Sequence, residues 1–303
     1  MLSRQTNKTV IIVCGPTAVG KTSVGIELAK NYDTEIISAD SRQCFKELNI
    51  GVARPSEKEL KTVVHHFIAP HSISEEINVS SFEKFTLTKA KEIFEKKNKL
   101  VLVGGTGLYI KAFCEGLDSI PPIPIEIRKK IIDEYEAKGL AWLQDEINKK
   151  DSTFFEKGEM QNPQRMMRAL EVVEGTGKSI LSFQSNQKLA RDFSVIKIGL
   201  ELPREQLYQN INNRVDEMLQ AGLEAEVKSL IPFRNLNALQ TVGYSEIFEY
   251  VDQKITLVQA VEKIKLNTRH YAKRQLTWFK RDKEINWFHP SQLSSIVDFL
   301  QNQ

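Results

Sequence analysis

The sequence predicts an α/β fold in which a parallel sheet is flanked by helices and joined to a mostly α-helical insertion. In the first third of the chain, short apolar runs alternate with helix-like stretches, a pattern typical of right-handed crossovers between parallel strands. A glycine-rich turn joins the first apolar run to the first helix, and a later proline cluster precedes a long stretch with little strand signal. At 303 residues, the chain has room for about two domains.

Three apolar runs are predicted to be buried parallel strands because they are rich in β-branched residues and end at small or polar residues. They are residues 10–13, 35–38 and 100–103. Helices are expected between them, from Lys21 to about Asn31 and from about Ser81 to Lys97, where apolar residues recur on one side. This order of elements favours a parallel sheet that is covered on both faces.

The proline cluster near residue 121 marks the start of the insertion. From Ile125 to about Leu189 the chain is largely helical, and residues 194–202 then alternate like a strand that returns to the sheet. Beyond Pro203 we expect helices almost to the end. We therefore predict a core of residues 1–119 and 194–303, with a helical insertion domain of residues 120–193.

The composition excludes several classes of protein. Hydrophobic residues at 41% and charged residues at 27% are typical of a globular chain and not of a disordered one. A net charge of +3 neither requires nor forbids a polyanionic partner. Three cysteines without a CxxC pair favour a reducing cytoplasm. The first apolar run is too short for a signal or membrane segment, so neither export nor anchoring is expected.

The segment from Gly15 to Thr22, GPTAVGKT, matches the phosphate-binding motif GxxxxGK[ST] between a strand and a helix, which is the context that this motif requires. It therefore predicts a P-loop NTPase-like core. The glycines let the backbone wrap around an anion, toward which successive amides and the helix N-terminus point. Lys21 adds positive charge, and Thr22 can ligate a phosphate-bound Mg²⁺. The motif indicates a polyphosphate without saying which one.

The ends of the other strands carry further candidates. Residues 100–103 lead into GGTGLY without a Walker-B carboxylate, which argues against ATP hydrolysis. Asp40 follows the second strand, where open α/β sheets assemble their sites, and is a candidate general base or magnesium ligand. It could instead cap the next helix. Thr106, after the third strand, either faces the phosphates or caps the helix that follows.

Basic residues gather near the C-terminus. Residues 263–283 hold eight Lys or Arg residues against one acid, and this patch is either a solvated helix face or a contact for nucleic-acid phosphates. Arg214 also has two interpretations, because its guanidinium could point at a phosphate or pair locally with Asp216 or Glu217.

Seven ordered motifs together resemble the tRNA dimethylallyltransferase (tRNA isopentenyltransferase) family. They are GPTAVGKT, ADSRQ, GGTGLY, NPQR, RVDEML, QTVGYSE and AKRQLTWF, and they extend from about Val10 to His289. The resemblance implies transfer of a dimethylallyl group from dimethylallyl diphosphate to N6 of the adenosine next to the anticodon on its 3′ side, in tRNAs that read codons beginning with U. It also explains the missing Walker-B acid, because the P-loop would hold an isoprenoid diphosphate.

The resemblance assigns roles by position in the matching motifs. Asp40 would be the general base, and Thr106 would hold the diphosphate or the nearby tRNA. Arg214 and the P-loop would bind the diphosphate, with Thr22 also on Mg²⁺: Gly15, Pro16, Thr17, Ala18, Val19, Gly20, Lys21 and Thr22. The expected RNA contacts, with the adenosine flipped out of its stack, are Asp40, Ser41, Arg42, Gln43, Thr106, Arg128, Gln164, Arg165, Met166, Met167 and Arg168. Many relatives have Asp where this chain has Asn162.

The expected partners are tRNA, through its anticodon stem-loop, and dimethylallyl diphosphate, with Mg²⁺ as cofactor, no membrane and a monomeric chain. Three alternatives stay open. A nucleoside or nucleotide kinase would use the insertion as a lid. An adenylate isopentenyltransferase would act on AMP or ADP, although the long insertion and basic helix favour a larger substrate. A non-catalytic RNA-binding protein would use the loop only as a nucleotide switch.

Overall fold

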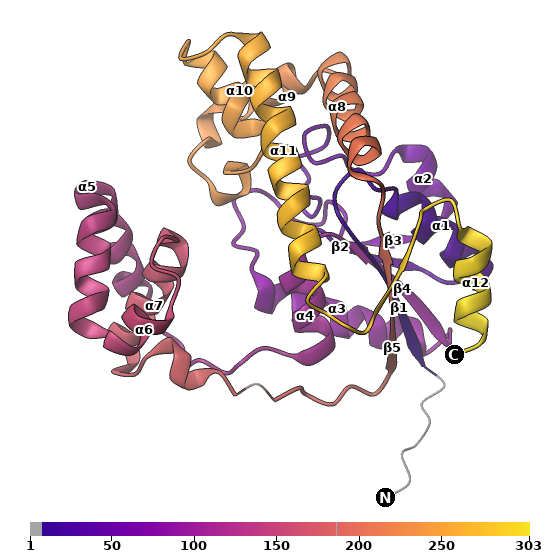
Figure 1. The fold of residues 1–303 in the computed structure, drawn as a ribbon, viewed down its shortest axis with the longest axis horizontal. Coiled ribbons are helices and arrows are strands. Elements are labelled where there is room, and N and C mark those ends of the chain that lie inside the picture. The colour runs from indigo at the N-terminus through magenta and orange to yellow at the C-terminus, as the bar shows by residue number, and fades with distance from the viewer. Residues whose placement is uncertain (1–7, 186) are drawn as a thin grey trace, which may run out of the picture. The chain divides into compact units, whose positions relative to one another are not determined.

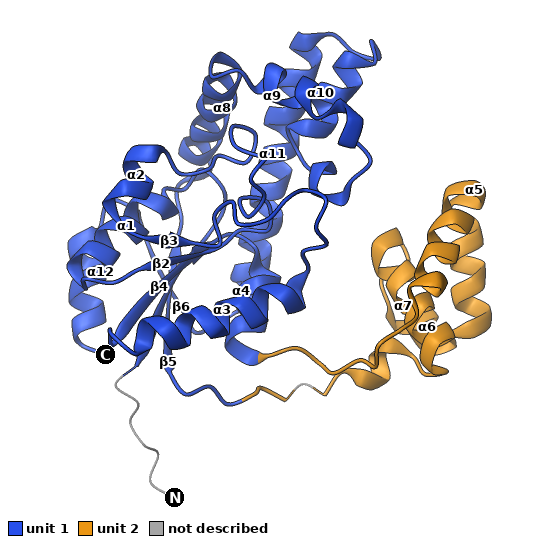
Figure 2. Cartoon of the chain, turned by 180° about the vertical axis from the view of Figure 1, so that it is seen from behind, with its two compact units in different colours: residues 1–115, 190–303 blue, residues 116–189 orange. Residues whose placement is uncertain are grey.

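The structure of the chain is a computed structural model that describes residues 8–185 and 187–303 (Figure 1). It divides into two compact units (Figure 2). Unit 1 comprises the chain up to Glu115 together with Ala190–Gln303, and unit 2 is Gly116–Leu189. Both limits fall a few residues before the domain limits predicted from the sequence.

Unit 1 is built on a six-stranded parallel sheet with the order β3-β2-β4-β1-β5-β6. The strands are β1 (Thr9–Cys14), β2 (Ile36–Ala39), β3 (His65–His66), β4 (Lys99–Gly104), β5 (Ser194–Leu200) and β6 (Ile285–Phe288). Successive residues of β1 enter different hydrophobic cores, with Ile12 on one face of the sheet and Ile11 on the other. Because both faces are buried, the central strands read as continuous apolar runs.

Helices cover both faces of this sheet (Figure 1). The helices of unit 1 are α1 (Lys21–Asn31), α2 (Glu57–Thr62), α3 (Val79–Phe94), α4 (Gly107–Glu115), α8 (Arg204–Gln220), α9 (Leu223–Ser229), α10 (Tyr244–Val251), α11 (Leu257–Phe279) and α12 (Leu293–Gln301). Short 3-10 turns lie at Ile231–Phe233 and Asn237–Leu239. Side chains of α1 and α12 share a core with Ile11, whereas those of α3 and α4 share one with Ile12. The predicted P-loop NTPase-like α/β fold is confirmed.

Two strands were not predicted, and both lie at the edges of the sheet. β3 has only two residues, which pair with Ile36 and Ile37 of β2. β6 lies in the C-terminal region that was predicted to be helical almost to its end, and that prediction is wrong at Ile285–Phe288. The predicted strand at residues 35–38 is also displaced by one position from the observed β2.

The register of the sheet brings three loops to one edge. Cys14, the last residue of β1, pairs with Gly104 of β4, and Gly104 pairs in turn with Ala39 of β2. The P-loop, the segment that begins at Asp40 and the segment that contains Thr106 therefore start at the same level. Open α/β sheets bind ligands at this edge, outside the carboxyl ends of their strands.

Unit 2 is a small helical unit with its own hydrophobic core. Its elements are α5 (Ile125–Lys150), α6 (Ser152–Lys157), α7 (Pro163–Thr176) and a 3-10 turn at Ile180–Phe183. α5 is interrupted at Gly139, whose φ of 75° lies in the left-handed region that glycine tolerates best. Buried residues of α5, α6 and α7 form the core: Ile131, Leu143, Ile147, Phe154, Met166, Ala169 and Leu170.

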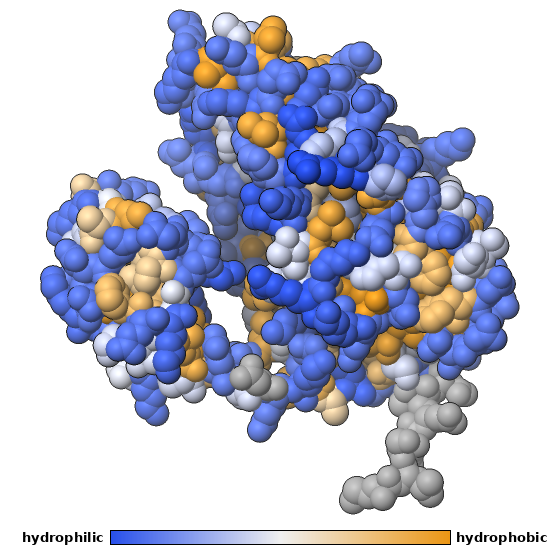
Figure 3. Space-filling model, viewed as in Figure 1, coloured by the Kyte–Doolittle hydropathy of each residue, from blue (hydrophilic) through white to orange (hydrophobic). Residues whose placement is uncertain are grey.

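The described part of the chain contains no helix that is long and apolar enough to cross a bilayer. On the face seen in Figure 3, hydrophilic side chains predominate and hydrophobic ones occur in scattered groups.

Asn162 begins α7, where its Oδ1 accepts a hydrogen bond from the backbone N–H of Arg165 at 3.3 Å. Asp caps a helix about as well as Asn, so an aspartate at this position would perform the same local task. We expect Asn162→Ala to destabilise α7 by about 1 kcal/mol and Asn162→Asp to be neutral or slightly stabilising. Amide hydrogen exchange of α7 measures the effect, which corresponds to about fivefold faster local opening.

The control is the exposed Gln164, which lies in α7 two residues after Asn162. Gln164→Ala leaves the cap intact. Unchanged exchange in Asn162→Ala would mean that the cap does not stabilise this helix.

Candidate active site

Two cavities meet at the edge of the sheet where the loops begin. The first has a volume of about 800 Å³ and is lined by the P-loop and by the ends of β2 and β4. The second, of about 580 Å³, is lined by residues 240–243, 245 and 246, by α8 and by α11. Thr17, Asp40 and Arg214 line both cavities. The predicted phosphate loop and the predicted base are therefore at one junction.

Two cations of the first cavity lie close to each other. Lys21, the first residue of α1, donates a hydrogen bond from Nζ to the carbonyl oxygen of Pro16 at 2.7 Å. Burial and the nearby charge of Arg214 lower the pKa of Lys21 to about 8. Burial also lowers the pKa of Arg214, whose Nη1 donates to Oγ1 of Thr17 at 3.4 Å. Like charges that are held together with little solvent favour an anionic ligand, which would offset both costs.

The alternative interpretation of Arg214, a local ion pair, does not hold for Asp216. The carboxylate of Asp216 pairs with Lys265 of α11 at 2.8 Å. No ion pair joins Arg214 to Glu217 in the described residues, although the charge of Glu217 partly offsets the lowering of the Arg214 pKa by burial. The Arg214 side chain instead reaches the P-loop.

Asp40 holds its own segment in place with one carboxylate oxygen. Its Oδ1 accepts hydrogen bonds from the backbone N–H groups of Arg42 at 2.8 Å and Gln43 at 3.2 Å. Residues 41–44 form turns, so Asp40 does not cap a helix. None of the described residues donates a hydrogen bond to Oδ2. Asp40 thus has one oxygen that is fixed and one that is available at the junction of the cavities.

Thr106 connects the loop after β4 to the loop after β2. Its Oγ1 accepts a hydrogen bond from the backbone N–H of Ser41 at 3.1 Å, and its own N–H donates to the carbonyl of Ala39 at 3.2 Å. The hydroxyl oxygen therefore binds the backbone of the segment beside Asp40. In the described residues it accepts no hydrogen bond from a backbone amide of α4, so it does not cap that helix.

A family model described as IPP transferase matches residues 43–282, which is most of the chain. This chain belongs to that family. Curated relatives named tRNA dimethylallyltransferase come from Flavobacterium psychrophilum, at 48% identity over 97% of this chain and 98% of the relative, and from Cytophaga hutchinsonii, at 45% identity over 97% of each. The resemblance identified from the sequence motifs is therefore confirmed.

Solved structures agree with this assignment to the IPP transferase family. A tRNA isopentenylpyrophosphate transferase from Bacillus halodurans is 34% identical and aligns with a TM-score of 0.71 over 98% of this chain and 96% of its own. A eukaryotic dimethylallyltransferase acting on tRNA is 26% identical and aligns with a TM-score of 0.80 over 98% of this chain and 80% of its own.

The other residues predicted around Asp40 divide into two groups in this family member. Ser41 and Arg42 line the second cavity. Gln43 lines the first, but its amide is engaged within the protein: Nε2 donates to the carbonyls of Val52 and Ala53 at 3.2 and 3.0 Å, and Oε1 accepts from the hydroxyl of Ser38 at 3.2 Å. Gln43 therefore braces the wall that both cavities share.

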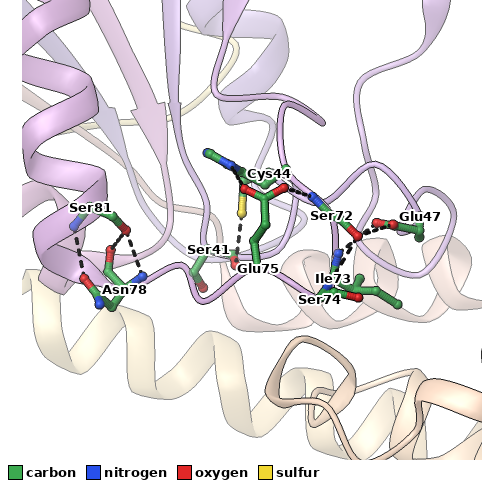
Figure 4. A network of polar contacts seen from close by, with 10 residues as sticks. Ser41, Cys44, Glu47, Ser72, Ile73, Ser74, Glu75, Asn78 and Ser81 are labelled. Carbon is green, nitrogen blue, oxygen red and sulfur yellow. Dashed lines mark hydrogen bonds and ion pairs between the residues drawn. The ribbon is translucent and has the colours of Figure 1, made fainter. Parts of the chain in front are cut away.

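A network of polar contacts connects the segment after Asp40 to residues 72–75 (Figure 4). The thiol of Cys44 donates to the carbonyl of Ser41 at 3.6 Å, and Glu47 accepts from the hydroxyl of Ser72 at 2.7 Å and the N–H of Ile73 at 3.0 Å (Figure 4). Glu75 accepts from the N–H of Ser72 at 2.7 Å. These contacts tie the segment that contains Ser41 to a neighbouring loop.

The site depends on Glu226 of α9, which sequence reasoning did not identify. Its Oε2 accepts from the N–H groups of Asn49 at 3.2 Å and Ile50 at 2.8 Å. Its Oε1 accepts from the N–H of Gly51 at 3.0 Å and the hydroxyl of Tyr244 at 2.6 Å. The next two residues of that loop line both cavities, so this carboxylate fixes their shared wall. Tyr244 belongs to the QTVGYSE motif, which had no assigned role.

We expect Glu226→Gln to destabilise the chain by about 2 kcal/mol, because its amide group would point a donor at backbone donors. Tyr244→Phe removes only one donor and should cost about 1 kcal/mol. Glu224→Gln on the same helix is the control, since it breaks only an exposed pair with Lys228, worth less than about 1 kcal/mol. Urea unfolding measures all three, and equal losses for both glutamate variants would contradict this role for Glu226.

The RNA contacts predicted in unit 2 need one correction. Met166 is fully buried in the core of that unit, so its predicted contact with RNA is wrong. Arg128, Gln164 and Arg165 are exposed, and Arg165 pairs with Glu159. Met167 and Arg168 are half-buried, and Arg168 pairs with Glu171 at 2.6 Å.

The basic C-terminal segment lies mainly on α11 and uses part of its charge within the protein. Lys263, Lys265 and Lys280 pair with carboxylates of Glu249, Asp216 and Glu201 respectively. In the described residues, no ion pair involves Arg274, which lines the second cavity.

Proposed function

We propose that the chain transfers the dimethylallyl group of dimethylallyl diphosphate to N6 of the adenosine 3′-adjacent to the anticodon, in tRNAs that read codons beginning with U. Diphosphate is the second product. The observation that supports this function best is the junction of two cavities at Asp40, one lined by the P-loop and the other by a separate set of polar and basic residues. The relatives described above are named tRNA dimethylallyltransferase, which agrees with transfer of this group to tRNA.

The first cavity suits the prenyl donor. Lys21, Arg214 and the amides of the P-loop would bind the diphosphate, and the dimethylallyl group would lie among apolar residues. The apolar lining includes Ile36, Ile50, Val52, Ile68, Val103 and Met218. As the C1–oxygen bond of the donor breaks, negative charge develops on the leaving diphosphate, and cations already in place stabilise it.

Mg²⁺ is proposed as a cofactor of the same cavity. Thr22 lines it, and in the described residues the Thr22 hydroxyl forms no hydrogen bond, so it is available as a ligand. Those residues also contain no group of three or more His, Cys, Asp and Glu side chains that would form a separate metal site. Held by Thr22 and diphosphate oxygens, Mg²⁺ would supply further charge neutralisation to the leaving group.

The second cavity suits the adenosine of the tRNA. Ser41 and Arg42 enter it from the segment after Asp40, and Tyr271 and Arg274 enter it from α11. A base that is flipped into this cavity presents N6 at the junction, where N6 attacks C1 of the dimethylallyl group. The proton that N6 loses goes to Oδ2 of Asp40, the carboxylate oxygen to which none of the described residues donates, while Thr106 holds the segment beside it.

The remaining contacts with the anticodon stem-loop are also proposals. Arg128, Gln164, Arg165, Met167 and Arg168 of unit 2 present polar or partly exposed groups suited to RNA. We further propose that the enzyme acts as a monomer in the cytoplasm, where its three free cysteines would stay reduced.

The purified chain incubated with Mg²⁺, dimethylallyl diphosphate and unmodified tRNA tests the function, with nucleoside mass spectrometry as the readout. N6-dimethylallyladenosine in tRNA alone is the expected product. Prenylated AMP would instead favour an adenylate isopentenyltransferase. Phosphoryl transfer from ATP would favour a kinase, and tRNA binding without any product would favour an RNA-binding module.

A further inference from the structure

Gln275 of α11 lies between two loops of the site. The side chain is only 7% exposed, and both ends of its amide are used. Its Oε1 accepts a hydrogen bond from the backbone N–H of Thr17 in the P-loop at 2.8 Å, and its Nε2 donates to the carbonyl of Gly105 at 2.9 Å. One buried amide thus joins the loop after β1 to the loop after β4, its neighbour in the sheet.

Gly105 allows the amide of Gln275 to come close to the backbone. A Cβ at position 105 would lie 2.2 Å from Nε2 of Gln275, so this close approach requires glycine. The AKRQLTWF motif therefore has a structural counterpart in GGTGLY, because the glutamine of the first contacts a glycine of the second.

The contact also determines which part of the P-loop is available to an anion. Pro16 has no N–H, and the N–H of Thr17 is taken by Gln275, so neither of these two residues can offer an amide to an anion. After Gly15, the next amide of the loop that can do so is that of Ala18. Ala18 has a φ of 64°, which residues other than glycine rarely adopt and which persists only where neighbours hold it. Gln275 fixes Thr17, the residue before Ala18, and Nδ2 of Asn210 donates to the carbonyl of Ala18 at 3.2 Å.

Gln275 is also connected to the segment of the proposed base, Asp40, through Gly105 and Thr106. Gly105 precedes Thr106, whose hydroxyl accepts from the N–H of Ser41, the residue after Asp40. We propose that Gln275 is a positioning residue that sets the diphosphate-binding loop and the Asp40 segment in fixed relation to each other. The inference rests on the proposed function, because it supposes that the loop binds the diphosphate of the donor.

The test replaces Gln275 with methionine in the full chain, since methionine has a similar length but neither donates nor accepts strongly. Binding of inorganic diphosphate with Mg²⁺ is measured by calorimetry, and tRNA binding by filter retention. We expect Gln275→Met to bind diphosphate about tenfold more weakly, with kcat lowered by at least as much, because two buried backbone groups lose their partner. tRNA affinity should stay within about twofold.

Two further variants separate positioning from a general loss of stability. Ala260→Gly lowers the stability of the same helix at a buried position in another part of it, and it should leave diphosphate affinity unchanged. Gln275→Glu retains an acceptor for Thr17 but has no proton for Gly105. Hydrogen exchange should therefore find the Thr17 amide still protected in Gln275→Glu and unprotected in Gln275→Met, while both variants lose kcat.

Three outcomes decide the inference. Wild-type diphosphate affinity and kcat in Gln275→Met would overturn it. So would a parallel loss of diphosphate and tRNA affinity in Gln275→Met and Ala260→Gly, because that pattern is explained by stability alone. If the wild-type chain itself bound no diphosphate, the donor site of the proposed function would be wrong, and the inference would fail with it.

Discussion

Replacing Asp40 with asparagine is expected to lower kcat by about 10²- to 10⁴-fold while tRNA affinity stays nearly unchanged. Asparagine retains an Oδ1 that accepts from the backbone amides of Arg42 and Gln43, so the turn after β2 should keep its shape. What is lost is Oδ2, the oxygen that would take the proton from N6. Single-turnover formation of N6-dimethylallyladenosine measures the first effect, and filter binding of tRNA measures the second.

Asp33→Asn is the matched control for this substitution. Asp33 is an exposed carboxylate that pairs with Lys97, and it lines neither cavity at the junction. It should therefore retain wild-type kcat. If Asp40→Asn turned over within about tenfold of wild type, the proton would have another acceptor. Equal losses of kcat and tRNA affinity would instead assign Asp40 to binding.

The central part of the fold could be predicted because its signals are local. β1 and β4 are neighbours in the sheet and buried on both faces, so each reads as an uninterrupted apolar run. Edge strands have a partner on one side only and need less apolar sequence. β3 consists of two histidines, and β6 contains the exposed Asn286, so neither resembles the central strands. The position of Asp40 followed from the rule that places sites beyond strand ends.

The contacts that hold the site could not be predicted in the same way. Gln275 is 258 positions from Thr17, and Glu226 is 177 positions from Asn49. In both cases the partner is a backbone amide, which any residue type provides, so no sequence pattern marks the pair. Met166 is different, because Met166, Ala169 and Leu170 recur at helical spacing along α7. That periodicity indicates a buried face, whereas the resemblance to the family implies an RNA contact for the same segment.

Replacing Lys21 with methionine is expected to lower kcat/KM for dimethylallyl diphosphate by about 10²- to 10³-fold at pH 7, since a cation aimed at the leaving diphosphate is removed. The size of this loss should depend on pH. Burial and the charge of Arg214 lower the pKa of Lys21 to about 8, against the opposing charge of Asp40. Because kcat/KM reports the ionisation of the free enzyme, wild type should lose the same charge as the pH rises.

The ratio of wild type to Lys21→Met should therefore fall by about fivefold between pH 8 and pH 9, as the charged fraction of Lys21 drops from about one half to about one tenth. The ionisation of the donor affects both proteins equally and cancels from the ratio. A constant ratio up to pH 9.5 would mean that Lys21 keeps its proton in the free enzyme.

The stability of the empty enzyme should change in the opposite sense. Because the pKa of Lys21 is lower in the folded chain than the ordinary value of 10.5, the unfolded chain binds more protons between about pH 8 and pH 10.5. The charged side chain thus destabilises the folded state below pH 8, and this cost is relieved as the pH rises through that window. Lys21→Met should consequently be more stable than wild type at pH 7 and should lose that advantage toward pH 10. Urea unfolding without ligand detects this difference, so a loss of activity through misfolding is distinguishable from the loss of a charge that binds the donor.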